Sequence, residues 1–186
     1  MNKYSCLNQQ IFSFEEYSLV PIRFEDRYDI MKWRNEQIYH LRQDKILTTE
    51  DQDNYFLNVV SKLYDEKKPN QILFSFLKNE KCIGYGGLVH INWVDRNAEI
   101  SFIMDTQLEK DNFELIWDIY LYLIEKIGFQ YLNLHKISTY AYDLRPRIYN
   151  VFEKNNFIKE AVLKSHKLFE NKYIDIVIHS KINNND

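Results

Sequence analysis

A polar and aromatic segment, residues 33–43 (WRNEQIYHLRQ), carries side chains that could recognise a ligand. Guanidinium groups donate hydrogen bonds in a fixed geometry, amides both donate and accept, and aromatic rings offer flat apolar faces. This mixture suits a sugar, a nucleotide or the polar end of a peptide. The alternative is a capped helix followed by a solvent-exposed loop. We expect substrate contacts from Trp33, Arg34, Asn35, Tyr39 and Arg42.

Three of the four glycines in the chain lie close together, at Gly84, Gly86 and Gly87. Glycine has no Cβ, so it occurs where another group approaches the backbone closely or where a strand bends. These glycines therefore either let the substrate approach a strand or form a β-bulge. We expect Tyr85, which lies between them, to contact the substrate.

Other kinds of catalytic site have little support in the sequence. The five histidines are scattered without the spacing of metal ligands, so we expect no metal. No G-x-x-x-x-G-K phosphate-binding loop occurs, and Cys82 has no histidine beside it that could activate a nucleophile. Cys6 and Cys82 are far apart in the chain, and we expect no disulfide between them.

Length and composition predict a single globular domain. The 186 residues include 45% hydrophobic and 27% charged side chains, with 14 Tyr and 12 Phe, a content that disordered chains lack. The formal net charge of −3 argues against a nucleic-acid partner. The first ten residues are polar and resemble neither a signal peptide nor a membrane anchor. We therefore expect a cytoplasmic protein without a membrane partner.

Hydrophobic periodicity predicts helices and strands in an α+β order. Residues 113–129 form the strongest predicted helix, because apolar side chains recur there every three or four positions. Thr48 or Thr49, followed by Asp51, resembles a helix N-terminus. Other helices are expected at 25–35 and 146–154. Strands are expected at 17–23, where Pro21 favours a sheet edge, and at 71–77, 82–91, 98–104, 135–142, 156–161, 163–168 and 173–180.

The order of these elements and several short motifs resemble the GNAT acetyltransferases. Residues 97–104 (NAEISFIM) resemble the strand before the acetyl-CoA pyrophosphate loop, and 113–129 resemble the helix after it. Residues 134–138 (LHKIS) resemble the next strand, and 151–157 (VFEKNNF) resemble the Y-E-K-x-G-F signature. Residues 30–35 (IMKWRN) resemble the first helix of the ribosomal-protein and aminosugar acetyltransferase branch. Five motifs in the family's order are more specific than any one alone.

The resemblance implies an α+β fold of the GNAT type. We expect a mixed, mostly antiparallel central sheet of about six to seven strands, with helices on both faces. One acetyltransferase domain is expected over residues 17–182, with an N-terminal extension over 1–16 and a disordered tail over 183–186. A monomer or a homodimer is expected.

The resemblance also implies acetyl-CoA as the co-substrate. In the family, a backbone N–H polarises the thioester at the point where two parallel strands splay apart, and residues 100–104 occupy that place. The asparagine that usually contacts CoA aligns with Arg145. The expected donor contacts are Ile100, Phe102, Ile103, Met104, Lys110, Asn112, Tyr142, Arg145 and Phe152.

The donor-binding loop departs from the family pattern. In the family, Q/R-x-x-G-x-G/A wraps the pyrophosphate with backbone N–H groups, and the aligned residues here are 109–114 (EKDNFE). No glycine remains. The carboxylates of Glu109, Asp111 and Glu114 are expected to face the anionic ligand, with Lys110 offsetting part of the repulsion. Alternatively, Asp111 and Glu114 only favour the start of a helix.

Acetyl transfer to an amine needs a base, because an alkyl amine is mostly protonated at neutral pH. The resemblance implies that Glu99 acts as this base through water. An ordinary ion pair with Arg96 or Lys136 is the alternative role for Glu99. His90, at the end of the glycine-containing strand, is a second candidate for a base or a substrate contact.

The leaving thiolate needs a proton. The family's tyrosine that often supplies it aligns with Phe152, which has no acidic proton. Tyr149, one helical turn earlier, or Tyr142 is expected to supply the proton instead. Packing is the alternative role for either tyrosine.

The resemblance therefore predicts an N-acetyltransferase that moves an acetyl group from acetyl-CoA to a primary amine. The acceptor is expected to be a small-molecule or peptide amine: a small amine, an aminosugar nucleotide or a protein N-terminus. One alternative is a binding or regulatory module on a GNAT scaffold whose donor site has decayed. Another is an acyltransferase that uses a larger or carrier-bound acyl group.

Overall fold

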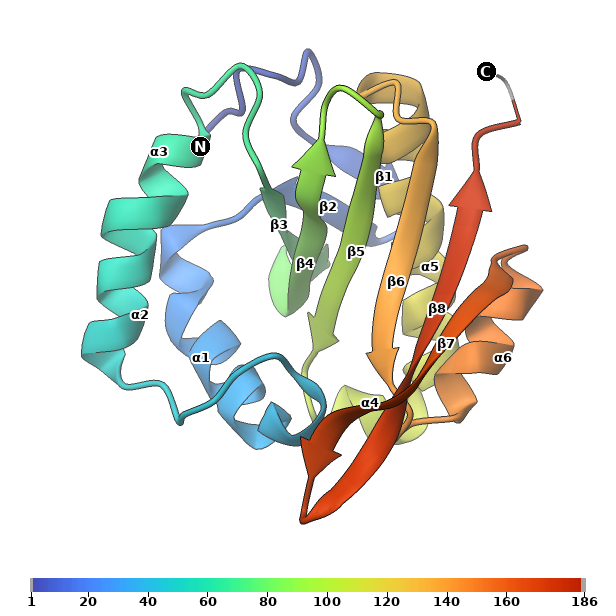
Figure 1. The fold of residues 1–186 in the computed structure, drawn as a ribbon. Coiled ribbons are helices and arrows are strands. Elements are labelled where there is room, and N and C mark those ends of the chain that lie inside the picture. The colour runs from blue at the N-terminus through green and yellow to red at the C-terminus, as the bar shows by residue number, and fades with distance from the viewer. Residues whose placement is uncertain (1, 185–186) are drawn as a thin grey trace.

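A single eight-stranded sheet runs through the computed structural model, which describes residues 2–184 (Figure 1). The strand order is β1-β2-β3-β4-β5-β6-β8-β7, and every neighbouring pair is antiparallel except β5 with β6. This confirms the predicted α+β fold with a mostly antiparallel mixed sheet. The strands are β1 (Phe12–Phe14), β2 (Tyr17–Pro21), β3 (Ile72–Lys78), β4 (Lys81–Asn92), β5 (Asn97–Met104), β6 (Lys136–Tyr142), β7 (Ile158–Phe169) and β8 (Lys172–Ile182).

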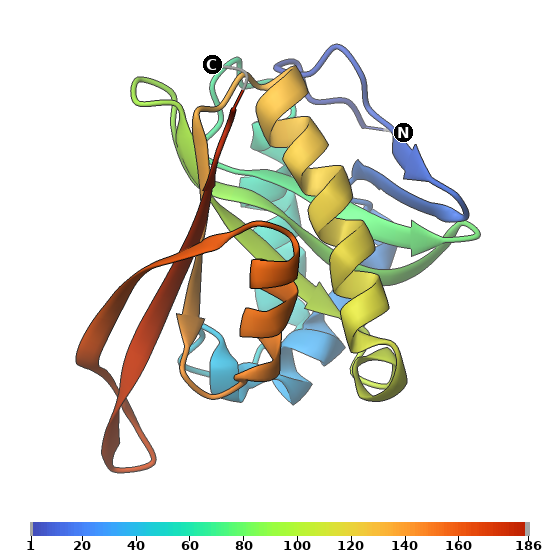
Figure 2. The same ribbon diagram turned by 90° about the vertical axis from the view of Figure 1, so that its right-hand side faces the viewer.

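Helices cover both faces of the sheet, with α1, α2 and α3 on one side and α5 and α6 on the other (Figure 2). No helix within residues 2–184 has the length and apolar content needed to span a membrane. The α-helices are α1 (Arg27–Glu36), α2 (Thr49–Tyr55), α3 (Ser61–Leu63), α4 (Leu108–Asp111), α5 (Phe113–Lys126) and α6 (Arg147–Lys154). Short 3₁₀ turns span Phe24–Asp26 and Ile38–His40, and π-helical turns span Phe56–Val60 and Ile127–Tyr131.

The central helix α5 follows the predicted apolar stripe. Tyr120, Leu123 and Ile124 are fully buried, and the Tyr120 ring stacks on Phe102 of β5 with ring centroids 3.8 Å apart. The predicted start of α2 is also confirmed. The Thr48 hydroxyl accepts a hydrogen bond from the backbone N–H of Asp51, and the Asp51 carboxylate accepts one from the backbone N–H of Thr48.

The described part of the predicted N-terminal extension packs onto the sheet. β1 pairs with the first three residues of β2, and this extra strand explains why eight strands form instead of six or seven. The buried Tyr4 hydroxyl exchanges hydrogen bonds with the backbone of Leu73, at 2.8 and 3.0 Å. Pro21 lies past the end of β1, where its missing N–H is tolerated. At the other end, Asn183 donates its N–H to the carbonyl of His135, and residues 185–186 lie outside the described chain.

The three clustered glycines allow β4 to pack closely against its neighbours. A Cβ on Gly86 would lie 2.1 Å from the Ser101 carbonyl oxygen and 2.5 Å from the Tyr120 hydroxyl. A Cβ on Gly84 would lie 2.7 Å from the carbonyl oxygen of Ile103. Protein atoms therefore fill the space beside these glycines. One β-bulge, opposite Phe76/Leu77, lies between Cys82 and Gly84, so the expected bulge occurs beside the first of these glycines. A second bulge lies between Val89 and Asn92.

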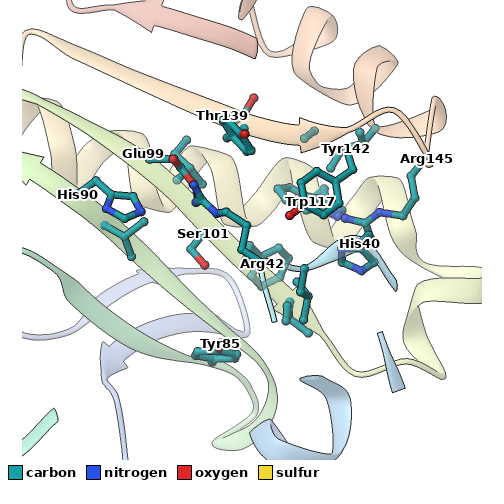
Figure 3. A pocket seen from close by; sticks show the side chains of 18 of the residues that line it. His40, Arg42, Tyr85, His90, Glu99, Ser101, Trp117, Thr139, Tyr142 and Arg145 are labelled. Carbon is teal, nitrogen blue, oxygen red and sulfur yellow. Dashed lines mark hydrogen bonds and ion pairs between the residues drawn. The ribbon is translucent and has the colours of Figure 1, made fainter. Parts of the chain in front are cut away.

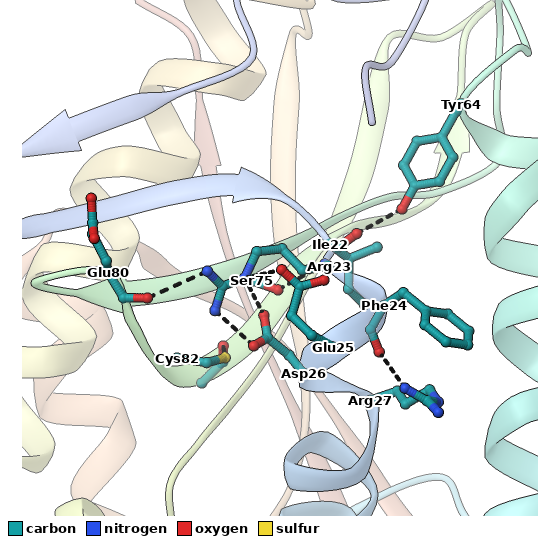
Figure 4. A network of polar contacts seen from close by, with 11 residues as sticks. Ile22, Arg23, Phe24, Glu25, Asp26, Arg27, Tyr64, Ser75, Glu80 and Cys82 are labelled. Carbon is teal, nitrogen blue, oxygen red and sulfur yellow. Dashed lines mark hydrogen bonds and ion pairs between the residues drawn. The ribbon is translucent and has the colours of Figure 1, made fainter. Parts of the chain in front are cut away.

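A polar network fixes the turn between β2 and α1 to the β3–β4 hairpin (Figure 4). Arg23 donates two hydrogen bonds of 2.7 Å to the two carboxylate oxygens of Asp26, and the Asp26 side chain is buried. The backbone N–H of Arg23 donates to the Ser75 hydroxyl, and the Arg23 guanidinium also reaches the carbonyl of Glu80. This bidentate pair is satisfied within the fold and positions α1 beside the sheet.

Candidate active site

The two parallel strands separate after three residue pairs. β5 and β6 pair at Asn97 with Lys136, Ala98 with Ile137 and Glu99 with Ser138, and no further β5–β6 pair occurs among the described residues. Residues 100–104 remain paired with β4, and residues 139–142 remain paired with β8. A cavity of about 490 Å³ lies at this gap. The splayed strands expected from the sequence are therefore present.

Most of the predicted donor contacts lie around this cavity. Met104 is not among its lining residues; its carbonyl accepts a 2.8 Å hydrogen bond from the Gln37 side chain. Lys110 and Asn112 line a second cavity, of about 440 Å³. The predicted donor contacts that line the main cavity are Ile100, Phe102, Ile103, Tyr142, Arg145 and Phe152.

Glu99 lies at the last paired position of β5 and points into the cavity (Figure 3). Its carboxylate forms an ion pair with Arg42, 57 residues earlier in the chain. The Arg42 guanidinium also lies over the ring of Tyr140, 4.7 Å from its centroid. Lys136, which the sequence offered as a partner for Glu99, pairs with Glu160. Glu99 thus has both the place expected of a base and a cationic partner at the cavity.

His90 lies in the bulge of β4 that faces the paired ends of β5 and β6. Its backbone has a positive φ of 52°, which directs this exposed side chain to the cavity edge. Histidine tolerates this conformation better than a β-branched residue would. The bulge therefore brings His90 and Glu99 to one cavity from adjacent strands (Figure 3).

Of the predicted substrate contacts, Arg34, Arg42 and Tyr85 line the cavity. Arg34 donates a 2.5 Å hydrogen bond to the Tyr85 hydroxyl and a 2.9 Å hydrogen bond to the Gln43 side-chain oxygen. No carboxylate among residues 2–184 forms an ion pair with Arg34, whose pKa is raised chiefly by the charge interaction with Tyr85. Arg34 thus presents a guanidinium whose partners are neutral.

The other predicted substrate contacts lie elsewhere. Trp33 is 3% exposed and belongs to the hydrophobic core. The Asn35 side chain exchanges hydrogen bonds with the backbone of Leu47, at 2.9 and 2.8 Å, and so holds the loop after α1. Tyr39 is exposed, and its ring packs edge-on against His40. None of these three lines the cavity.

The two candidate proton donors occupy different places. Tyr142 lines the cavity, and burial raises the pKa of its hydroxyl. Tyr149 lies outside the cavity lining, donates a 2.8 Å hydrogen bond to Asp143 and stacks on the ring of His179. Burial, followed by the Asp143 hydrogen bond, raises the pKa of Tyr149 far above its ordinary value. Phe152 lines the cavity where the family has its tyrosine.

The segment aligned with the family's glycine loop is helical. α4 forms one turn, Asn112 interrupts it, and α5 begins at Phe113. Glu109 was expected to face the donor, but it lines neither cavity. Glu109 is 6% exposed, and its Oε1 lies 3.0 Å from Arg145 and 2.7 Å from Arg147. A helical turn directs this side chain inward, toward the two arginines before and at the start of α6.

Several cavity residues carried no clear signal in the sequence. Ser101 and Thr139 lie on the inner edges of the splayed strands, and Trp117 projects from α5. Trp117 belongs to the apolar stripe of residues 113–129, and periodicity alone does not distinguish a core position from a pocket position. His40 also lines the cavity, and its pKa is lowered to about 3 by burial first and by Arg145 next. His40 is therefore neutral at physiological pH.

Comparison with known proteins adds a family to this geometry. The family model described as an acetyltransferase (GNAT) domain matches residues 19–178. The chain belongs to the GNAT acetyltransferase family. Its class of activity is therefore N-acetyl transfer from an acyl-CoA donor. Comparison with curated proteins finds no match.

Solved structures share the fold at low sequence identity. A spermidine N-acetyltransferase from Vibrio cholerae in complex with CoA and spermine superposes with a TM-score of 0.78 at 17% identity, covering 91% of this chain and 97% of that one. A dodecameric spermidine N-acetyltransferase from the same organism superposes with a TM-score of 0.72 at 19% identity, covering 91% and 95%. At such identity these likenesses establish the fold and leave the acceptor open.

Proposed function

We propose that this GNAT protein transfers an acetyl group from acetyl-CoA to the primary amine of an acceptor that also carries an anionic group. The observation that carries this proposal is the charge of the cavity at the splayed strands. Arg34, Arg42 and Arg145 line it, and among the described residues Glu99 is its only carboxylate. An acceptor with several ammonium groups would be repelled there, whereas a phosphate or carboxylate would be attracted.

Glu99 is the proposed base. An amine with a pKa near 10.4 costs roughly 4–5 kcal/mol to deprotonate at pH 7, and a positioned base typically contributes about 10²–10⁴-fold in rate. Glu99 accepts the ammonium proton through water. The amine nitrogen then bonds to the thioester carbon, the carbon–sulfur bond breaks, and the nitrogen gives its second proton to water, from which Tyr142 regains the proton that it donates. Backbone N–H groups of residues 100–104 stabilise the charge on the carbonyl oxygen, and Tyr142 returns a proton to the thiolate.

The ion pair of Arg42 with Glu99 gives the anionic group a specific role. While Arg42 holds the carboxylate, Glu99 is partly occupied as a base. An acceptor anion that draws Arg42 away frees the carboxylate beside the amine. Arg34, with neutral partners only, offers a second contact for the same anion. Among the acceptors expected from the sequence, an aminosugar nucleotide combines an amine with permanent phosphate charge.

Release of CoA thiol tests this proposal. Purified protein with acetyl-CoA is offered an aminosugar nucleotide, a peptide with a free N-terminus, and spermidine. We expect the highest kcat/KM for the aminosugar nucleotide and the lowest for spermidine. The reverse order would overturn the acceptor assignment. CoA binding without thiol release from any acceptor would instead favour a binding or regulatory module.

Two variants separate the roles of base and anion contact. Glu99→Gln is expected to lower kcat by tenfold or more with little loss of donor affinity, because it removes the base. Arg34→Gln is expected to raise KM for the anionic acceptor by about tenfold, and to leave kcat/KM for a simple alkyl amine unchanged. Unchanged turnover in Glu99→Gln would place the base elsewhere, with His90 next to be tested.

We retain a monomer or a homodimer as the expected assembly, which sedimentation analysis tests.

A further inference from the structure

The place of the family's glycine loop is filled by a helical turn in this chain. Residues 108–111 are α-helical, and the Asn112 side chain forms no cap on α5. Asn112 and Glu114 stand where the family pattern has small residues. A backbone cradle of the glycine-loop kind is therefore crowded here. A diphosphate at this place needs other donors.

Two arginines near the start of α6 approach this helical turn. Arg145 lines the main cavity, and Arg147 lines the second cavity with Lys110 and the first turn of α5. Both guanidinium groups bind the same oxygen of Glu109. The arginines and Glu109 therefore connect the two cavities, from the splayed strands to the N-terminus of α5.

The cluster carries one more positive than negative charge, and the extra charge belongs to the half-exposed Arg147. One carboxylate faces two guanidinium groups, and the side chains of Glu109 and Arg145 are only 8% and 15% exposed. Asp111 and Glu114 also line the second cavity, and they are exposed like Arg147, so water and salt screen the charges of all three. Burial lowers the pKa of Arg145, and Glu109 acts in the opposite direction. Burial first, and the charge of Arg145 next, lower the pKa of His40.

The geometry of Arg147 also suits an anion. Its guanidinium lies over the Phe113 ring, 4.0 Å from the centroid, so the ring supports its flat face. The N–H groups at the guanidinium edge bind Glu109 and remain suited to two phosphate oxygens at once. The first turn of the 14-residue helix α5 adds backbone N–H groups without intrahelical partners.

We propose that Arg145 and Arg147 form a side-chain clamp for the diphosphate of the CoA donor, and that Glu109 holds the clamp until the donor replaces it. This inference rests on the proposed function, because it names the donor's binding residues. The clamp takes over the role of the lost glycines. It also makes Glu109 a competitor of the donor.

Calorimetric titration without acceptor tests the clamp apart from catalysis. Three ligands are used: CoA, dephospho-CoA, which keeps the diphosphate, and pantetheine, which lacks it. For Arg147→Gln we expect the Kd for CoA and for dephospho-CoA to rise by about tenfold or more, with the Kd for pantetheine unchanged. Lys154→Gln is the matched control, since it removes the same charge at the other end of α6 and is expected to change none of the three.

Glu109→Gln is expected to change the affinity for CoA in the opposite direction. Removing the competing carboxylate is expected to tighten CoA binding by about threefold or more, whereas loss of a merely structural residue would weaken it. Circular dichroism checks that this variant is folded, and the half-exposed Arg147→Gln carries the test if it is not.

Equal CoA affinity of wild type and Arg147→Gln would overturn the clamp, as would equal weakening of CoA and pantetheine or a wild type that binds no CoA. If Arg147→Gln weakened the binding of CoA but not of dephospho-CoA, Arg147 would contact the 3′-phosphate instead of the diphosphate. Turnover of acetyl-pantetheine tests the proposed function independently. Absence of thiol release beside Arg147-dependent CoA binding would refute the function and leave the clamp standing.

Discussion

Two arginine–carboxylate clusters of this protein, each with a buried carboxylate, differ in their charge balance. At the turn between β2 and α1, one arginine meets one carboxylate, and Arg23 and Asp26 satisfy each other with two parallel hydrogen bonds. At the start of α6, Arg145 and Arg147 share a single oxygen of Glu109. The first pair lines neither cavity, and the second cluster lines both.

This difference separates a structural pair from a binding site. A buried charge costs several kcal/mol unless a partner compensates it. The Arg23–Asp26 pair is compensated within the fold, so a ligand could gain nothing there. The Glu109 cluster is left short of one negative charge, and an anion from outside can supply it. The first cluster should therefore act on stability alone, and the second on both stability and donor affinity.

The largest expected effect is a loss of stability when the balanced Arg23–Asp26 pair is broken. Asp26→Asn keeps the shape of the side chain but leaves the mostly buried Arg23 without its counter-charge, so we expect a loss of about 3 kcal/mol in the free energy of unfolding. Urea denaturation measures it. Glu25→Gln is the control, because Glu25 lies 3.6 Å from Arg23 and is 69% exposed; its loss should stay below about 1 kcal/mol. Equal losses would mean that Asp26 is not the partner that matters.

Removing the carboxylate of the unbalanced cluster is expected to lower the free energy of unfolding by less than Asp26→Asn does. Glu109→Gln should cost about 1–3 kcal/mol, because Arg145 loses its carboxylate partner while the half-exposed Arg147 regains water. Saturating CoA should then raise the Tm of Glu109→Gln by more than it raises that of wild type, since the diphosphate supplies the missing charge. Asp26→Asn should show only the wild-type increase. Thermal unfolding with and without CoA measures both, and a CoA response that is the same in all three proteins would remove the distinction.

Much of the fold follows from local sequence signals. The stripe of α5 and the capping box at Thr48 and Asp51 are short-range patterns, and both are confirmed. The splayed β5–β6 pair also appears as expected from the family motifs. β1 is not among the strands predicted from the sequence, because three residues carry too little periodicity to identify a strand. Local patterns thus predict elements of normal length and lose the short ones.

The site is harder to predict because its contacts are long-range. Arg42 reaches Glu99 across 57 residues, and Arg147 reaches Glu109 across 38. Neither partner can be chosen from sequence spacing. The direction of Glu109 depends on one helical turn, which turns the carboxylate away from the expected ligand. Trp33 shows the converse, because an aromatic residue in a polar segment belongs to the core.

The smallest expected effect comes from His40, which is partly buried beside the second cluster. Burial and Arg145 lower the pKa of His40 from 6.5 to about 3, so the folded protein keeps it neutral while the unfolded chain protonates it below pH 6.5. Stability from this group is complete above pH 6.5 and is lost as the pH falls, by at most about 1.4 kcal/mol per pH unit. His40→Gln should flatten the wild-type slope between pH 6.5 and 5, whereas His166→Gln, at an exposed position, should not. Denaturation midpoints across this pH range measure the slopes, and an equal slope in wild type and His40→Gln would show that His40 does not cause the pH dependence.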